Sequence, residues 1–434
     1  MIELVTIFSI LLITLIGFTA IQIFHLFEKH GVPEALLLGF GLGCGLVSGQ
    51  LFLYSVFHVS WSIPALLLPW IAFFIYPLFR RSEKFTLKFS HKQKYTTIQK
   101  ILIVLVFSLL IYVFFEAQLR TVSAWDAWSI WLLKAKVFYV DGFINPRIFN
   151  YLESDYPLVI SLSLTFMAKM IGSFNDRVLL LLSFAYYAAE SGLLFIALKK
   201  RIGLTKALVA TFLFMSLQNI VRHGGRFEAG QADLPLGYFM LCDVLLIFEY
   251  IRKPNVKILA LLTAFLAITT QVKHEGIVFA FIVEIAIFYF ALKKKKYKHL
   301  LSGLFVVCPV IGWQIFVGSG SFHYSYFSGH HTILSIHKAW NSIIGFMKEF
   351  LNIKNWNLLW VAFFGVLLAS LRCLKPEQKL LLYFIFSQFF VYFLLYCFTT
   401  GNDPQSSIDR LFIHVCALAI LFITQGIFQE KGVK

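Results

Sequence analysis

Residues 101–119 read ILIVLVFSLLIYVFFEAQL, an apolar stretch with one charged residue that is long enough to cross a bilayer as a single helix. A transmembrane helix needs about 20 mostly apolar residues to cover a hydrocarbon core about 30 Å thick. Similar stretches recur along the whole chain, at about residues 4–24, 35–57, 61–79, 101–119, 157–172, 178–198, 207–221, 234–251, 258–272, 276–292, 299–317, 356–373, 380–398 and 411–428. The sequence therefore predicts an all-α, polytopic membrane helical bundle with about 13 or 14 hydrophobic segments.

The composition of the whole chain agrees with this prediction. The 434 residues are 59% hydrophobic and 14% charged, whereas a soluble domain carries about 25% charged residues. This composition excludes a soluble enzyme and a disordered chain. The six cysteines lie mostly within or at the ends of apolar stretches, and none form a C-x-x-C pair. Neither a zinc site nor a disulfide framework is indicated.

The net charge of +16 reflects membrane topology rather than nucleic-acid binding. Most Lys and Arg residues lie in short loops between apolar stretches, as the positive-inside rule expects of cytoplasmic loops. These loops are residues 80–100, 199–206, 252–257, 293–298 and 372–379. The N-terminus then faces out, together with residues 120–156, 221–233, 273–275, 318–355 and 399–410. Both ends of the stretch 157–172 fall on this outer side, so it is not a simple span. Either it is a re-entrant or half-inserted helix, which is allowed where protein or water covers its ends, or one neighbouring loop is assigned to the wrong side of the membrane.

The first outer segment predicts an amphipathic helix. Four apolar residues recur there at positions i, i+3, i+4 and i+7, which places them on one helical face: Trp128, Trp131, Leu132 and Ala135. A helix of this pattern lies along a membrane surface, and the long side chain of Lys134 can extend from it toward the interface.

Asp126 stands at the start of this helix, between Trp125 and Trp128. One interpretation is structural, because a carboxylate at a helix start can cap the first N–H groups and is favoured by the helix dipole. The other is chemical. A carboxylate flanked by two tryptophans is partly desolvated, which makes it a better general base at the membrane–water boundary.

Two further outer segments carry acidic and basic residues. In residues 153–158, Asp155 and Tyr156 precede a helix that starts at Pro157, so Asp155 either lies at the helix start or faces the same cavity as Asp126. In residues 222–236, Asp233 either caps the next helix or acts chemically. Two arginines of that segment, Arg222 and Arg226, offer guanidinium groups that are well shaped for phosphate.

Two short motifs place ionisable residues at the outer ends of apolar stretches. Lys273, His274 and Glu275 stand together between two such stretches. Ionisable residues at membrane depth are costly and indicate a functional site, although a Lys–Glu ion pair facing other helices is the structural alternative. Arg410 and His414 are four residues apart and share one helical face. They form either an interfacial anchor or a phosphate clamp.

Taken in order, these motifs resemble bacterial members of the GT-C glycosyltransferase superfamily, integral membrane enzymes related to the lipid A aminoarabinose transferase and the protein O-mannosyltransferases. The matching motifs are Trp125-Asp126, Tyr156-Pro157-Leu158, Ala232 to Leu236 (ADLPL), Lys273 to Gly276 (KHEG) and Asp409 to His414 (DRLFIH). The resemblance covers residues 101–420. It implies two parts: residues 1–100 as an N-terminal three-helix membrane segment with a basic cytoplasmic loop, and residues 101–434 as a GT-C-like transmembrane catalytic module.

The resemblance implies transfer of a sugar, with inversion, from a polyprenyl-phosphate or polyprenyl-diphosphate carrier to a lipid, glycan or protein acceptor. The site would face the exterior of a bacterial inner (plasma) membrane. Asp126 would be the general base, and Glu228 or Asp233 a second carboxylate. The candidates for the lipid phosphate are Arg226, Lys273, Arg410 and His414. The remaining substrate-binding candidates are Trp125, Trp128, Lys134, Asp155, Tyr156, His274 and Glu275.

Two other functions would use the same charged residues. A transporter or flippase of a lipid-linked glycan would line its path with them, and a non-catalytic subunit of envelope assembly would use them for binding. The clustering of charges at outer helix ends favours surface chemistry, because a transporter would scatter them through broken spans. No cofactor is indicated. A divalent cation stays open, although no set of metal ligands stands out.

Overall fold

The computed structural model describes residues 2–23, 31–79, 94–145, 156–318, 336–398 and 404–428. Every regular element in these residues is a helix. The helices are α1 (Ile2–Ile23), α2 (Val32–Val56), α3 (Ile63–Phe79), α4 (Thr97–Leu119), the π-helix η1 (Ala127–Trp131), α5 (Leu132–Asp141), α6 (Val159–Ile171), α7 (Asp176–Leu179), α8 (Leu181–Ile202), α9 (Leu204–Met215), α10 (Gln218–Gly225), α11 (Asp233–Arg252), α12 (Val256–Thr269), α13 (His274–Lys293), the 3-10 helix η3 (Tyr297–Leu301), α14 (Ser302–Gly318), α15 (Ile336–Phe350), α16 (Ile353–Trp356), α17 (Leu359–Ser370), α18 (Pro376–Phe398) and α19 (Pro404–Phe428).

The predicted all-α membrane bundle is confirmed. Nine helical stretches of the described residues are long and apolar enough to cross a membrane, and the pair α9–α10, bent by 70°, adds a tenth if it is one span. The remaining apolar segments form helices of 10–17 residues. At a rise of about 1.5 Å per residue, most of these are shorter than a hydrocarbon core of about 30 Å. The 13 or 14 apolar segments therefore include helices that do not span on their own.

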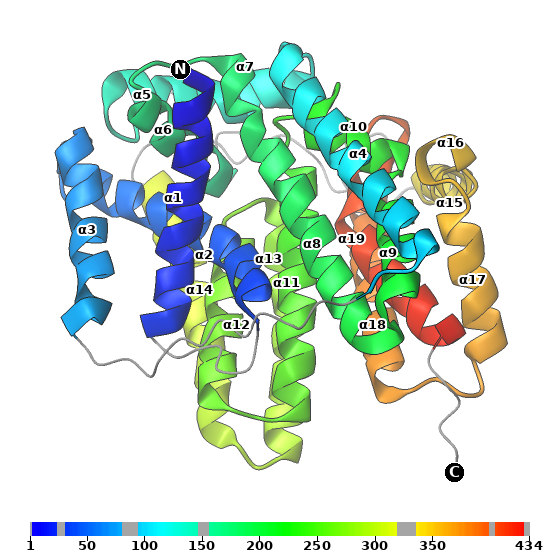
Figure 1. Cartoon of the computed structure of the whole chain (residues 1–434). Coiled ribbons are helices and arrows are strands. Elements are labelled where there is room, and N and C mark those ends of the chain that lie inside the picture. The colour runs from blue at the N-terminus through cyan, green and yellow to red at the C-terminus, as the bar shows by residue number, and fades with distance from the viewer. Residues whose placement is uncertain are drawn as a thin grey trace.

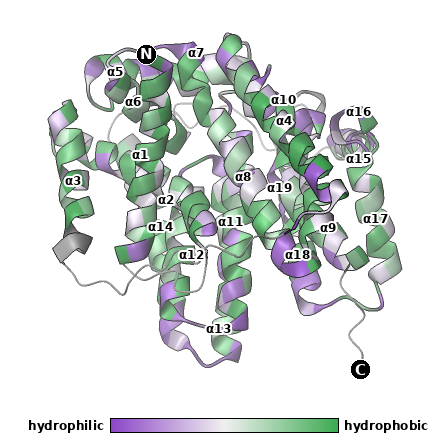
Figure 2. Cartoon of the chain, viewed as in Figure 1, coloured by the Kyte–Doolittle hydropathy of each residue, from purple (hydrophilic) through white to green (hydrophobic). Residues whose placement is uncertain are grey.

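The two ends of the bundle differ in character. Figure 1 places the N-terminus at the same end as α5, α6, α7 and α10, whereas the connections α11–α12 and α13–α14 lie at the opposite end. Figure 2 shows hydrophobic colouring along most of the helices and hydrophilic residues at those two connections. The lysine-rich turn 293–296 belongs to this hydrophilic end. The molecule is thus built as a multi-pass integral membrane protein.

Helix α6, from the stretch whose two ends fall on the outer side, has 13 residues and is buried from Val159 to Ala168. Neighbouring elements cover its polar groups. The Val159 N–H donates to the Gln271 carbonyl at 3.1 Å, and the Thr165 hydroxyl lies 3.2 Å from the Ala135 carbonyl in α5. A short helix whose polar groups are covered by protein meets the condition for partial insertion.

Helices α1 and α2 pack with their backbones in close contact at glycines. A methyl group added at Gly43 would lie 1.9 Å from the Ile13 carbonyl oxygen, and one added at Gly17 would lie 1.9 Å from the Gly39 carbonyl oxygen. Small residues let membrane helices approach in this way. The same pair of helices reaches the core of the bundle, because the Gly41 N–H donates to the Tyr238 hydroxyl of α11 at 3.0 Å.

Gly43→Ala is therefore expected to destabilise the protein by about 1–3 kcal/mol, the usual cost of forcing an extra carbon into a packed contact. Gly49→Ala in the same helix is the matched control, since a methyl group there meets nothing within 4 Å and Ala favours a helix over Gly by roughly 0.5–1 kcal/mol. Thermal unfolding in detergent compares the two. Equal unfolding midpoints would contradict the close helix contact.

Candidate functional site

The carboxylate of Asp126 faces a cation rather than capping a helix. Asp126 precedes η1 with helical backbone angles (φ −61°, ψ −32°) and makes no cap hydrogen bond. Its carboxylate instead forms an ion pair with the Arg410 guanidinium of α19, 284 positions later in the chain. Both side chains are partly exposed, by 28% for Asp126 and 22% for Arg410. The capping interpretation of Asp126 is therefore wrong.

A second group of ionisable residues is buried around Asp233. The Lys273 Nζ donates to Asp233 Oδ1 at 2.8 Å and lies 3.2 Å from Glu275 Oε1. The His414 Nε2 lies 3.1 Å from the same Asp233 oxygen. All four residues are buried. Asp233 is the first residue of α11, after the N-cap position of Ala232, and its carboxylate is directed to these partners, so the capping interpretation fails here too.

Helix α19 brings the two groups together. Arg410 and His414 are one helical turn apart, so they project from the same face. Arg410 contacts Asp126 and also donates to Gln231 Oε1 at 3.0 Å, while His414 contacts Asp233. We call this set the ionic centre; its members are Asp126, Asp233, Lys273, Glu275, Arg410 and His414. Its residues come from the first outer segment, the start of α11, the α12–α13 junction and α19.

Glu228 lies at the rim of the ionic centre. The Arg222 Nη2 donates to Glu228 Oε1 at 2.6 Å, and the Gln231 Nε2 donates to the other carboxylate oxygen. The Arg222 Nη1 lies 3.9 Å from Asp409 Oδ2. Because Gln231 contacts both Glu228 and Arg410, the predicted second carboxylate is linked to the ionic centre through one amide side chain.

Arg226 points elsewhere. Its Nε lies 3.6 Å from Glu116 Oε2 in α4, and its guanidinium lies 5.2 Å from the Phe227 ring. Glu116 also pairs with Arg120. Arg226 and Glu228 are close in sequence, but their side chains therefore contact different partners. Of the predicted phosphate contacts, Lys273, Arg410 and His414 lie in the ionic centre, and Arg226 lies beside α4.

Aromatic side chains border the ionic centre. Tyr156 stacks on the His274 ring, with centroids 4.8 Å apart and planes at 28°, and Trp131 lies 5.5 Å from Tyr156. The Lys134 Nζ lies 5.9 Å from the centre of the Tyr156 ring, and Lys134 is 3% exposed. The expectation that Lys134 extends to the membrane surface is therefore wrong, because it packs inward beside Tyr156. Asp155 lies outside the described residues.

The predicted face of the first outer helix is also altered. In η1 the Leu132 N–H bonds to the Ala127 carbonyl five residues earlier, so the helix is wider there than the 3.6-residue period assumes. Trp131, Leu132 and Ala135 are buried in the protein, whereas Trp128, predicted on the same apolar face, is 46% exposed. Trp128 packs edge-to-face on the exposed Trp125, with centroids 4.6 Å apart. The two tryptophans are thus available to a ligand or to lipid.

Two residues of α18 support the ionic centre and were not predicted from the sequence. The Tyr392 hydroxyl lies 2.6 Å from His414 Nδ1, and the Gln388 Nε2 donates to the Glu275 carbonyl at 3.4 Å. The hydrogen bond on Nδ1 decides the orientation and tautomer of a histidine ring. Tyr392 in an aromatic, apolar stretch is indistinguishable from a membrane-belt tyrosine, whereas Gln388 is a polar residue within a span.

Three buried carboxyl groups inside the spans also escaped the sequence analysis. Glu190 is fully buried, and neither of its oxygens has a hydrogen-bond partner among the described residues. Thr269 donates to Asp243 at 2.7 Å, and Ser302 donates to Glu284 at 3.1 Å. Each is an isolated acid in an apolar stretch, which is a signal for function in a membrane protein. No three His, Cys, Asp or Glu side chains of the described residues form a metal-binding group.

Comparisons with known proteins agree with this architecture. A family model described as dolichyl-phosphate-mannose-protein mannosyltransferase matches residues 155–313. The crystal structure of ArnT from Cupriavidus metallidurans in the apo state is similar to the chain, with a TM-score of 0.54 and 13% sequence identity over 78% of this chain. The match spans 61% of ArnT. No curated protein sequence matches the chain.

At that identity the likeness to ArnT shows a shared fold alone. Residues 155–313 hold Tyr156, Glu228, Asp233, Lys273 and Glu275 of the site. The comparisons thus show that residues 155–313 match a mannosyltransferase family model and that the chain shares its fold with ArnT.

Proposed function

We propose that the protein transfers a sugar, with inversion, from a polyprenyl-phosphate-linked donor to an acceptor at the outer end of the bundle. The observation that carries this proposal is the ionic centre, in which Arg410 and His414 on one face of α19 each hold a carboxylate. Sugar transfer of this kind needs a base that takes the proton of the attacking hydroxyl and cations that stabilise the leaving phosphate. The ionic centre contains both.

Asp126 is the proposed general base. Inversion requires one carboxylate that takes the proton of the attacking group on the side opposite the leaving group. The acceptor oxygen then forms the new bond to the sugar carbon while the bond to the lipid phosphate breaks, and the phosphate leaves with the bonding electron pair. Asp126 fits this role better than Asp233 does, because its side chain is 28% exposed while that of Asp233 is 2% exposed.

Arg410 has two roles in this proposal. In the free protein it pairs with Asp126, and guanidinium groups bind phosphate as readily as carboxylate. A donor phosphate bound by Arg410 would release Asp126 to accept a proton, so the base becomes available when the donor is present. Lys273 adds positive charge deeper in the centre, His414 offers a ring nitrogen there, and Asp233 positions both of them.

The acceptor is a lipid, glycan or protein, and the proposed place is a bacterial plasma membrane with the ionic centre facing the exterior. The test is to supply radiolabelled polyprenyl-phosphate sugar to the purified protein with an extract of envelope acceptors. Release of free polyprenyl phosphate together with a labelled acceptor supports the transferase. Donor binding without release of polyprenyl phosphate, under conditions in which the protein is folded, would contradict it.

A flippase of lipid-linked glycans is the second candidate. The observation that favours it is the set of three buried acids inside the spans, Glu190, Asp243 and Glu284, because such residues also line transport paths. The two functions differ in a liposome assay with a fluorescent polyprenyl-linked sugar. A flippase moves the lipid between leaflets with its sugar still attached, whereas the proposed transferase cleaves the sugar–phosphate bond.

Tyr392→Phe is expected to lower sugar transfer by about fivefold to tenfold, the effect of losing one hydrogen bond worth about 1–1.5 kcal/mol. Without the hydroxyl at 2.6 Å from Nδ1, the His414 ring loses its orientation toward Asp233. A changed pH profile of transfer would show that the effect passes through His414. Tyr383→Phe in the same helix is the control, since the Tyr383 hydroxyl bonds to the Ile282 carbonyl instead; equal losses in both variants would contradict the role of Tyr392.

A further inference from the structure

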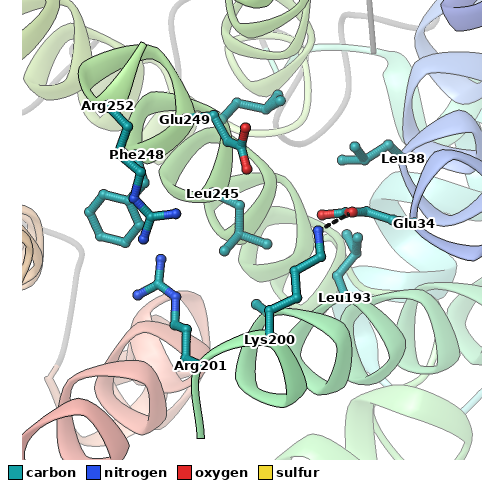
Figure 3. Close-up of a pocket in the computed structure, with 11 residues that line it drawn as sticks. Glu34, Leu38, Leu193, Lys200, Arg201, Leu245, Phe248, Glu249 and Arg252 are labelled. Carbon is teal, nitrogen blue, oxygen red and sulfur yellow. Dashed lines mark hydrogen bonds and ion pairs between the residues drawn. The ribbon is translucent and has the colours of Figure 1, made fainter. Parts of the chain in front are cut away.

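A second polar site lies among the ends of three spans, away from the ionic centre. It is a cavity of about 160 Å³ enclosed by α2, α8 and α11 (Figure 3). Its polar lining includes Glu34 near the start of α2, Lys200 and Arg201 at the end of α8, and Arg252 at the end of α11. Because these residues stand where membrane helices begin or end, the cavity lies at the level of lipid head groups.

The rest of the lining is apolar and lies farther into the spans. Leu38 follows Glu34 by one turn of α2, Leu193 precedes Lys200 by two turns of α8, and Leu245 precedes Arg252 by two turns of α11. Figure 3 shows Leu245 and Leu193 between the charged side chains. The cavity thus combines a charged mouth at the head-group level with apolar walls toward the hydrocarbon, as the end of a phospholipid requires.

One wall of the cavity is cationic. Figure 3 shows the guanidinium groups of Arg201 and Arg252 facing each other. Glu377 of α18 lies between them, 3.0 Å from Arg201 Nη1 and 2.7 Å from Arg252 Nη2. The Arg201 guanidinium also lies 5.1 Å from the Phe248 ring. Two guanidinium groups thus share one carboxylate, so this wall keeps an excess of one positive charge for an anionic oxygen.

The facing wall carries acids. Glu34 pairs with Lys200 at 2.5 Å, and the Glu34 side chain is 11% exposed. Figure 3 places the Glu249 carboxylate at the edge of the same space, on the other side from Arg201. Arg201 and Arg252 exceed Glu377 by one positive charge on the first wall, and Glu34 and Glu249 exceed Lys200 by one negative charge on the facing wall. A site with excess positive charge on one wall and excess negative charge on the other complements a zwitterion better than an anion.

We propose that this cavity binds the phosphoethanolamine head group of a membrane phospholipid. The phosphate lies against Arg201 and Arg252, and the ammonium lies against Glu249 and Glu34. A primary ammonium donates three hydrogen bonds, which a trimethylammonium group does not do, so the site distinguishes ethanolamine from choline. The lipid bridges α2, α8 and α11 and stabilises the end of the bundle opposite the ionic centre.

The test uses the full-length protein, freed of lipid in detergent and titrated with short-chain phosphatidylethanolamine, phosphatidylcholine or phosphatidylglycerol. Native mass spectrometry measures bound lipid, and the midpoint of thermal unfolding measures stabilisation. We expect phosphatidylethanolamine to bind about tenfold more tightly than the other two, a difference of about 1.4 kcal/mol. Equal binding of phosphatidylcholine would contradict recognition of the primary ammonium. Tighter binding of phosphatidylglycerol would contradict the preference for a zwitterionic head group.

Three variants locate the binding. Arg201→Gln removes the excess positive charge of the first wall, and Leu245→Trp fills the cavity without changing its charge; each is expected to weaken phosphatidylethanolamine binding about tenfold. Lys253→Gln is the control, because Lys253 is exposed beside Arg252 and does not line the cavity. If Leu245→Trp folds and binds the lipid as the unaltered protein does, the lipid lies elsewhere and the proposal is wrong.

Discussion

Asp126→Asn is expected to reduce sugar transfer at least about 100-fold, the lower bound of what a general base contributes, while the protein still folds. The amide keeps the size of the side chain and accepts a hydrogen bond from Arg410, but it does not take a proton. Folding is expected to survive because the Asp126–Arg410 pair is partly exposed, and exposed ion pairs contribute about 0–1 kcal/mol. Single-turnover transfer from a labelled polyprenyl-phosphate sugar measures the effect.

Donor binding gives this variant a second readout. Loss of the carboxylate frees Arg410 for the donor phosphate, so donor binding is expected to be retained or tightened while transfer stops. Asp176→Asn is the matched control, because Asp176 is an exposed aspartate at the start of α7, at the same end of the bundle. Near-normal transfer by Asp126→Asn would refute the base assignment. Loss of transfer in both variants would show that removing any negative charge at this end of the bundle impairs transfer.

The fold was largely predictable from hydropathy, because burial in lipid demands long apolar helices and little else. What hydropathy does not distinguish is an apolar helix that spans from one that is covered by protein. The stretch 157–172 illustrates the problem. Its composition is that of a span, but α6 has 13 residues and lies buried against α2 and α5. The rule of positive loops signalled this, since both of its ends were placed on one side.

The candidate site was predictable as a list of residues but not as a set of pairs. Ionisable residues at the outer ends of apolar stretches singled out Asp126, Asp233, Lys273, Arg410 and His414. Their partners were not predictable, because Asp126 and Arg410 are 284 positions apart and a carboxylate at a helix start satisfies the capping pattern whether or not it caps. Tertiary contacts exclude the capping interpretation for both aspartates.

Errors in the first outer helix arose from assuming an ideal period. Trp128 and Trp131 were placed on one face, but Trp128 is 46% exposed and Trp131 is 2% exposed; Lys134 was expected to extend to the interface and is 3% exposed. The π-turn at Ala127–Trp131 changes the rotation per residue before α5 begins. A lysine next to an aromatic ring in a covered helix has a favourable inward position, which an amphipathic pattern alone does not reveal.

Lys273→Met is expected to impair both stability and sugar transfer. The ammonium of Lys273 lies 2.8 Å from Asp233 and 3.2 Å from Glu275, and its side chain is 8% exposed. Removing one partner from a buried ion pair leaves an uncompensated charge and costs about 3–5 kcal/mol. The midpoint of thermal unfolding in detergent measures the loss, with Lys253→Met, an exposed lysine, as the control. An unchanged midpoint would contradict the buried ion pairs.

The double variant Asp233→Asn, Lys273→Met separates the two effects. Removing the Asp233 charge as well leaves His414 as a neutral partner and eliminates much of the unpaired charge, so part of the lost stability is expected to return. Sugar transfer is expected to stay low, because the proposed cation for the departing phosphate is still absent. Recovery of transfer along with stability would show that Lys273 serves only to neutralise Asp233, and the phosphate would then be held by Arg410 alone.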